Sequence, residues 1–184
     1  MKFLMPIPLL ALLALGTPAA AATVDYAKSE ISFVSRQMNV PVQGRFRKFT
    51  AQVDFNPNKL DAARAQIEVE LASVDTGSTE ADAEVVKKGW FNTSAFPTAK
   101  FVSNSVRQIA PGRYEARGTL TIKGIGQDVI APFSLKRAGD VATYAGEFVI
   151  RRLQYKIGEG IWSDTDTVAD DVQVKFRIVS TGNK

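Results

Sequence analysis

Apolar and polar residues alternate along most of the chain after Thr23, which is the pattern of strands that bury one face and expose the other. The clearest case is residues 113–123, where small or apolar side chains occupy one face and charged or hydroxyl side chains the other. Similar alternation occurs at residues 31–33, 42–46, 67–71, 99–109, 128–137, 141–152 and 171–180. The pattern predicts about eight strands and an all-β fold.

Short turns separate these strands. Residues 56–58, 110–112, 123–126 and 138–140 contain proline, which fixes φ, or glycine, which permits positive φ. Links this short favour antiparallel neighbours. A closed barrel and a β-sandwich both have such spacing. We expect the barrel, because closure removes exposed strand edges without the disulfides that a chain with no cysteine cannot form.

One segment breaks the alternation. Residues 78–88 hold good helix formers, with Ser78 or Thr79 as the N-cap, acids in the first turns and Lys87 and Lys88 at the end. Acids at the start and bases at the end of a helix complement its dipole. The fold predicted from the whole pattern is therefore an eight-stranded antiparallel barrel with one short helix inserted between strands.

The first 22 residues are expected to be a signal peptide. Lys2 supplies a basic start, an apolar run follows to Leu15, and small residues precede Thr23. The run is shorter than the roughly 20 apolar residues that span a bilayer. We expect residues 23–184 to form one domain that is periplasmic or secreted and is not stably inserted in a membrane.

Charge and composition narrow the chemistry. Loss of Lys2 leaves 22 basic against 19 acidic residues, a net charge of +3 that does not suggest nucleic-acid binding. The chain has no histidine and no cysteine, which removes the commonest nucleophiles, bases and metal ligands. Asp164, Asp166, Asp170 and Asp171 form a dense acidic cluster that offers a Ca²⁺ site or a carboxylate pair, but a solvated loop is the favoured interpretation. We expect no catalytic residue, no metal and no cofactor.

The predicted inward faces mix large and small residues. Phe46, Leu120 and Phe148 share strand parity with Gly44, Gly118 and Gly146 respectively. Small inward residues leave volume, and an eight-stranded barrel is wide enough to hold one ligand. The same alternation also fits a tapered barrel that is filled by its own side chains. The pattern leaves both interpretations open.

Several motifs resemble the YceI family of lipocalin-like periplasmic proteins. They are residues 73–77 (SVDTG), 90–92 (WFN), 96–103 (FPTAKFVS), 118–124 (GTLTIKG), the stretch around Arg152 and residues 172–174 (VQV). The resemblance covers nearly all of residues 23–184. It implies a long apolar tunnel that binds a polyisoprenoid chain, such as the tail of a quinone or a prenol phosphate. A homodimer and a membrane partner that uses quinone are also compatible with the family.

Two departures from the family pattern limit what can be transferred. Residues 81–84 (ADAE) stand where family members often carry Arg-Asp-x-His, so a polar contact made by that Arg or His is not expected here. The aromatic pair is Trp90–Phe91 in place of two phenylalanines, which narrows that part of the wall.

The candidate ligand-binding residues are the large inward side chains. We predict a tunnel lined by Phe33, Val42, Phe46, Val69, Leu71, Trp90, Phe91, Phe101, Leu120, Ile122, Phe133, Phe148, Ile150, Trp162, Val174 and Phe176. Arg152 shares parity with Phe148 and Ile150, so it is the candidate contact for a ligand head group, against a structural ion pair. The predicted function is non-catalytic binding and carriage or storage of an isoprenoid lipid. The alternatives are a packed secreted stress or interaction protein and an enzyme that uses the aspartates.

Overall fold

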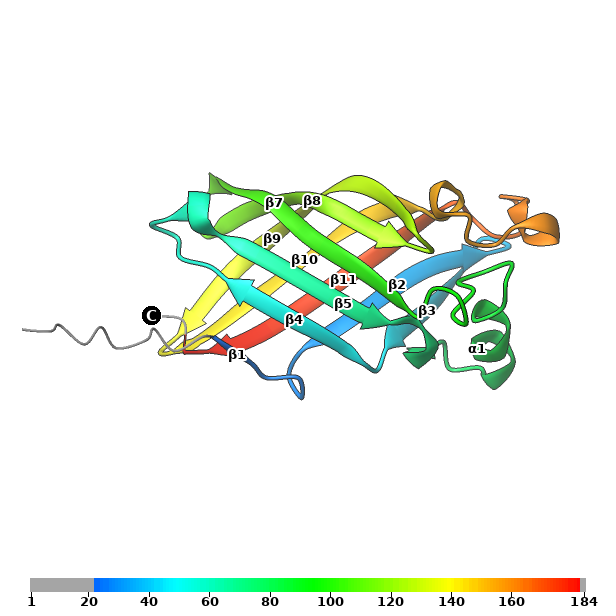
Figure 1. The fold of residues 1–184 in the computed structure, drawn as a ribbon, viewed down its shortest axis with the longest axis horizontal. Coiled ribbons are helices and arrows are strands. Elements are labelled where there is room, and N and C mark those ends of the chain that lie inside the picture. The colour runs from blue at the N-terminus through cyan, green and yellow to red at the C-terminus, as the bar shows by residue number, and fades with distance from the viewer. Residues whose placement is uncertain (1–21, 183–184) are drawn as a thin grey trace, which may run out of the picture.

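The computed structural model describes residues 22–182, so the predicted signal peptide lies outside the described residues apart from Ala22. Eleven strands form one antiparallel sheet that curls around an elongated interior, and the helix covers one end (Figure 1). Within residues 22–182, no helix is long and apolar enough to cross a membrane.

The strands are β1 (Thr23–Val24), β2 (Glu30–Gln37), β3 (Val40–Phe46), β4 (Phe49–Asp54), β5 (Arg64–Glu70), β6 (Val74–Asp75), β7 (Thr98–Ala110), β8 (Arg113–Ile122), β9 (Ile125–Ala138), β10 (Val141–Arg151) and β11 (Asp171–Thr181). The α-helix is α1 (Thr79–Val85). Four 3₁₀ turns are η1 (Leu60–Ala62), η2 (Leu71–Ser73), η3 (Arg152–Tyr155) and η4 (Gly160–Ser163).

The sheet returns on itself where β3 and β4 meet β5 and β6. Its hydrogen-bonded order is β4-β5-β7-β8-β9-β10-β11-β2-β3-β6. Only Arg47 and Lys48 separate β3 from β4, and only η2 separates β5 from β6. The Arg47 N–H donates to the Ser73 carbonyl (3.0 Å), and the Glu70 N–H donates to the Lys48 carbonyl (3.1 Å). Each pair of segments therefore acts as one bent strand, which gives the predicted eight-stranded antiparallel barrel with β1 as a short addition to β11.

The predicted strands are confirmed, with differences at their ends. Strand β4 was missed, although Phe49, Ala51 and Val53 do alternate with polar residues. Leu71 and Arg152 were expected in strands, but they lie in η2 and η3, where the chain leaves the sheet. The helix is shorter than residues 78–88, and it begins after Ser78, whose hydroxyl accepts from the Ala81 N–H (3.3 Å).

Two apolar clusters fill the ends of the barrel. At the end far from α1, Phe55 makes edge contacts with Tyr114, Phe133 and Tyr144 at ring centroid distances of 5.0–5.8 Å. Near α1, a second cluster contains Leu71, Ala99, Leu120, Ile122, Ile150, Tyr155 and Ile157. Buried apolar area of this kind is the main stabilising contribution in a protein without disulfides.

The small inward residues are covered by aromatic rings. Phe33 is paired with Gly44 across β2 and β3, and Phe176 with Gly146 across β11 and β10. A Cβ at Gly146 would lie 2.7 Å from the Phe176 ring and would also collide with the Pro132 carbonyl. A Cβ at Gly118 would lie 2.8 Å from the Phe101 ring. Much of the volume that these glycines release is therefore taken by neighbouring phenylalanines.

We expect Gly146→Ala to lower the free energy of unfolding by about 1–3 kcal/mol, because the added methyl group meets backbone and ring atoms that have little room to move. Gly89→Ala is the matched control, since a Cβ there meets nothing closer than 3.9 Å. Urea unfolding of both variants measures the difference. Equal stability of the two would show that the Phe176 ring is not held against Gly146.

Tyr155 gives a second test of the core. Its side chain is 1% exposed, and its hydroxyl finds no hydrogen-bond partner among residues 22–182. Burial raises the pKa of Tyr155 from 10.0 to about 12, because the phenolate would lose its hydration. The folded state therefore holds the phenol proton more tightly than the unfolded state, and that contribution to stability is complete below pH 10 and is lost towards pH 12.

At neutral pH, the free energy of unfolding of Tyr155→Phe should lie within about 1 kcal/mol of the wild-type value, since no hydrogen bond is lost. Between pH 10 and pH 12 the wild type should lose about 2–3 kcal/mol relative to the variant. Parallel urea unfolding across this pH range measures the difference in the free energy of unfolding between the two proteins. The other titrating residues are the same in both proteins, so their contributions cancel in this difference. A difference that does not change with pH would contradict the raised pKa of Tyr155.

Candidate functional site

The barrel encloses two cavities that lie one behind the other. The outer cavity, next to α1, has a volume of about 450 Å³. The inner cavity has a volume of about 150 Å³ and reaches the aromatic cluster around Phe55. Phe46 and Val174 line both.

The inner cavity is apolar. Its wall includes ten of the predicted tunnel residues: Phe46, Val69, Leu71, Phe101, Leu120, Ile122, Phe133, Phe148, Val174 and Phe176. Arg64 also borders it, but the guanidinium donates outside the cavity, to the carbonyls of Asp61 and Ala63. A wall of this composition offers a ligand dispersion contacts and removal of apolar surface from water.

The outer cavity combines apolar and polar walls. Phe33, Val42, Trp90, Phe91 and Trp162 are the predicted residues that line it in addition to the two shared ones. The indoles of Trp90 and Trp162 are in contact, with ring centroids 5.7 Å apart. The polar contribution comes from Ser32, Ser35, Gln37, Thr76, Ser78, Glu80 and Glu84. The polarity of the lumen therefore rises towards α1.

Sequence reasoning predicted none of these seven polar residues as part of the wall. Ser35 and Gln37 share strand parity with Ile31 and Phe33, so their inward position could have been inferred. Glu80 and Glu84 lie on α1, whose placement over the barrel mouth leaves no sign in the sequence. The Glu84 carboxylate accepts from Lys87 Nζ (2.6 Å), and this hydrogen bond lowers the pKa of Glu84.

Ile150 is placed differently from the prediction. It is buried in the cluster with Leu71 and Tyr155, and it is not among the residues that line either cavity. The structure thus gives Ile150 a packing role at the end of β10. All other predicted tunnel residues border one cavity or both.

Arg152 lies in the wall of the outer cavity but does not extend β10 as expected. It is 2% exposed and begins η3, directly after the strand ends. Its Nε donates to the Ala169 carbonyl, Nη1 to those of Ile157 and Gly158, and Nη2 to those of Trp162 and Val168, at 2.6–3.0 Å. A guanidinium has five N–H donors, so all of them are engaged.

The surroundings of Arg152 hold it in place. A Cβ at Gly158, whose φ is +77°, would collide with the guanidinium, so glycine is required there for both reasons. The Arg152 Cζ lies 6.0 Å from the centroid of the Trp90 ring. Burial lowers the pKa of Arg152, and the charge of Asp170 acts in the opposite direction. Arg152 therefore fastens residues 157–169 to the barrel, and a head group nearby would meet a buried charge without a free N–H.

Three of the four aspartates in the acidic cluster have separate local partners. Asp164 accepts from the Thr167 hydroxyl (2.7 Å), Asp170 accepts from the Leu153 N–H (2.9 Å), and Asp171 lies 3.9 Å from Arg151. Across residues 22–182, no group of three or more acidic side chains is arranged to hold a metal ion.

We expect Arg152→Lys to lower the free energy of unfolding by at least about 3 kcal/mol, because an ammonium has three donors for five buried carbonyls. Arg151→Lys is the matched control, since Arg151 is exposed and its ion pair with Asp171 is a 3.9 Å contact. The control should change the free energy of unfolding by no more than about 0.5 kcal/mol. Urea unfolding distinguishes the two. Similar losses for both variants would contradict the role given to Arg152.

Comparison with known proteins agrees with this architecture. BcnA of Burkholderia cenocepacia is 42% identical, with a TM-score of 0.84 over 86% of this chain and 100% of that one. A polyisoprenoid binding domain from Saccharophagus degradans, implicated in plant cell wall breakdown, shares the fold at 16% identity, with a TM-score of 0.70 over 88% and 98% of the two chains. A UPF0312 protein of Shewanella denitrificans is 28% identical over 115 residues, which are 62% of this chain and 57% of that protein. This chain thus matches a little over half the length of that relative. The YceI-like domain model matches residues 23–180, and the chain belongs to the YceI-like family.

Proposed function

We propose that the protein binds one long-chain isoprenoid lipid in the barrel lumen and carries or stores it without chemical conversion. The observation that carries this proposal is the order of the two cavities, an apolar inner one and an outer one whose wall becomes polar near α1. That order matches an amphipathic molecule with a long apolar tail and a compact head group. The polyisoprenoid binding domain with the same fold supports the choice of ligand class.

The driving force is removal of the tail from water. Burial of each CH₂ group contributes about 0.8 kcal/mol before the ordering of the chain is subtracted. The aromatic and aliphatic wall of the inner cavity supplies the matching surface. A packed barrel that acts only through its outer face would also have an apolar interior, but it would fill that interior with its own side chains. The cavities of about 150 and 450 Å³ therefore lead us to favour lipid binding over the secreted interaction protein.

The charges of the outer cavity favour a neutral head group. Glu80 and Glu84 line it, and the N–H groups of Arg152 are engaged by carbonyls. A phosphate would be repelled by the carboxylates and would find no donor in Arg152. A quinone ring needs only hydrogen-bond donors for its carbonyl oxygens. The Ser35 hydroxyl and the Gln37 amide, which share strand parity with Phe33, are suitable donors in the wall of the outer cavity.

The cellular setting is part of the same proposal. The basic and apolar start of the chain directs it to the periplasm, where a lipid must cross water between membranes. Delivery of a quinone to a membrane protein that uses it would follow, either from a single barrel or from a homodimer. The lack of histidine and cysteine in the sequence favours carriage over catalysis.

The first test is to express residues 23–184 and extract the purified protein with organic solvent for mass spectrometry. We expect one polyprenyl compound per chain. The same protein, stripped of lipid, should take up ubiquinone in preference to a prenol phosphate. An empty extract, together with no uptake of either compound, would rule out the lipid function.

Val174→Trp places a large side chain where the two cavities meet, and we expect it to reduce ubiquinone uptake at least about tenfold. Lys175→Trp is the matched control, because Lys175 alternates with Val174 and Phe176 on β11 and so faces away from the lumen. Bound quinone is measured by absorbance after gel filtration, with circular dichroism to verify folding. Equal uptake by the two variants would place the ligand outside the lumen.

A further inference from the structure

The two cavities meet at a single aromatic side chain. Among the described residues, only Phe46 and Val174 border both cavities, and Phe46 is the larger of the two. The Phe46 ring lies in a row of three, with centroids 5.6 Å from Phe33 and 6.1 Å from Phe91. We infer that Phe46 is a gate that sets the length of the isoprenoid tail the lumen accepts, an inference that rests on the proposed function.

The neighbouring rings cannot serve as the gate. The far edge of the Phe33 ring occupies the space that a Cβ of Gly44 would take, so Phe33 forms part of the wall. Both Phe33 and Phe91 border the outer cavity alone. A tail that fills only the outer cavity meets all three rings where they stand. A tail that continues into the inner cavity must displace the Phe46 ring.

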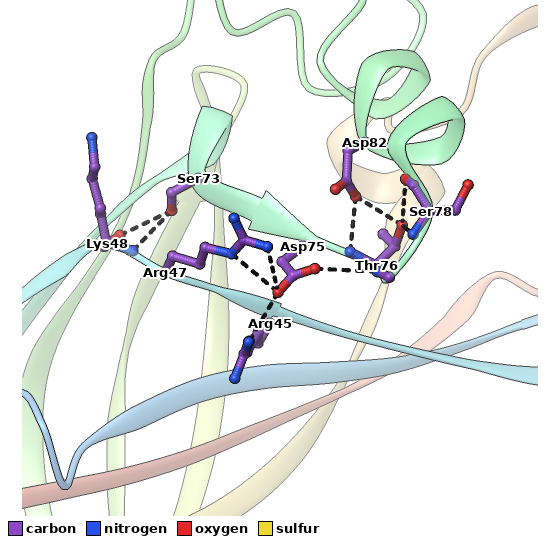
Figure 2. Close-up of polar contacts among 9 residues, drawn as sticks. Arg45, Arg47, Lys48, Ser73, Asp75, Thr76, Ser78 and Asp82 are labelled. Carbon is purple, nitrogen blue, oxygen red and sulfur yellow. Dashed lines mark hydrogen bonds and ion pairs between the residues drawn. The ribbon is translucent and has the colours of Figure 1, made fainter.

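The backbone that carries Phe46 is fixed from outside the barrel. Phe46 is the last residue of β3, paired with Ile31 on one side and Val74 on the other. The residues before and after it, Arg45 and Arg47, are exposed, and both donate through Nε to Asp75 Oδ2, at 3.0 and 3.1 Å (Figure 2).

Further polar contacts extend this support to the helix. The Ser73 hydroxyl accepts from the Lys48 N–H (3.0 Å), just beyond Arg47. Thr76 donates through its N–H and its hydroxyl to Asp82 Oδ1 on α1, both at 2.8 Å (Figure 2). With the main chain held on both sides, rotation of the Phe46 side chain is the motion left to open the passage. Rotation of this side chain needs no rearrangement of the sheet.

The test compares two prenols of different length, farnesol and solanesol, presented in phosphatidylcholine vesicles to lipid-free protein. Phe46→Trp should lower retained solanesol at least about tenfold more than retained farnesol, because the larger ring closes the passage but leaves most of the outer cavity. Phe33→Trp is the matched control. It narrows the outer cavity that both prenols occupy, so it should lower both to a similar degree.

Phe46→Ala is a second test of the gate, for use if the tryptophan variant does not fold. Removal of the ring should speed solanesol uptake and leave farnesol retention nearly unchanged. The gate is refuted if Phe46→Trp changes both prenols equally, or if Phe46→Ala loses solanesol more than farnesol. A wild-type protein that retains neither prenol nor ubiquinone would instead refute the proposed function itself.

Discussion

Closure of the sheet is the constraint on which the rest of this structure depends. The barrel closes through two bent strands, and the ladder continues across both bends through the main-chain bonds at Arg47 and Glu70. Closure satisfies the backbone donors and acceptors of nearly every strand, and it also fixes the width of the interior. The inward side chains must then fill that width or leave it empty. The glycines and the phenylalanines beside them are one example, because each ring occupies the space that a Cβ of the neighbouring glycine would take.

The mouth of the barrel is held together by a different interaction. Burying the Arg152 cation with no carboxylate among its hydrogen-bond partners incurs a large desolvation penalty, which five carbonyl acceptors and the charge of Asp170 offset. Those carbonyls belong to residues 157–169, a stretch with little regular structure that borders the outer cavity. One side chain thus orders a loop whose own backbone groups would otherwise have few partners. Gly158 and Trp90 shape the space in which the guanidinium fits.

Strand alternation was sufficient to predict the barrel and most of its inner wall, because parity determines which side chains face inward. It failed where the chain leaves the sheet. Parity placed Arg152 at the end of a strand, whereas the left-handed turn at Lys156 and Gly158 brings carbonyls around it. Alternation also left open whether the inward glycines leave free volume or are covered by neighbouring side chains. Cross-strand register decides which ring faces Gly44 or Gly146, and register is set by the closure of the whole sheet.

A cavity of the size of the inner one is costly for a protein of this kind, because the side chains around it lack packing partners. Apolar voids destabilise by about 24 cal/mol per Å³, so a volume near 150 Å³ corresponds to about 4 kcal/mol. Its wall includes Ala65, Ala99, Ala116 and Ala131, positions where larger side chains would remove much of that loss. A ligand that binds the folded state alone would recover the lost contacts and raise stability with its concentration. The proposed lipid carrier requires such volume in its lumen, whereas a barrel selected for stability alone would have filled it with larger side chains.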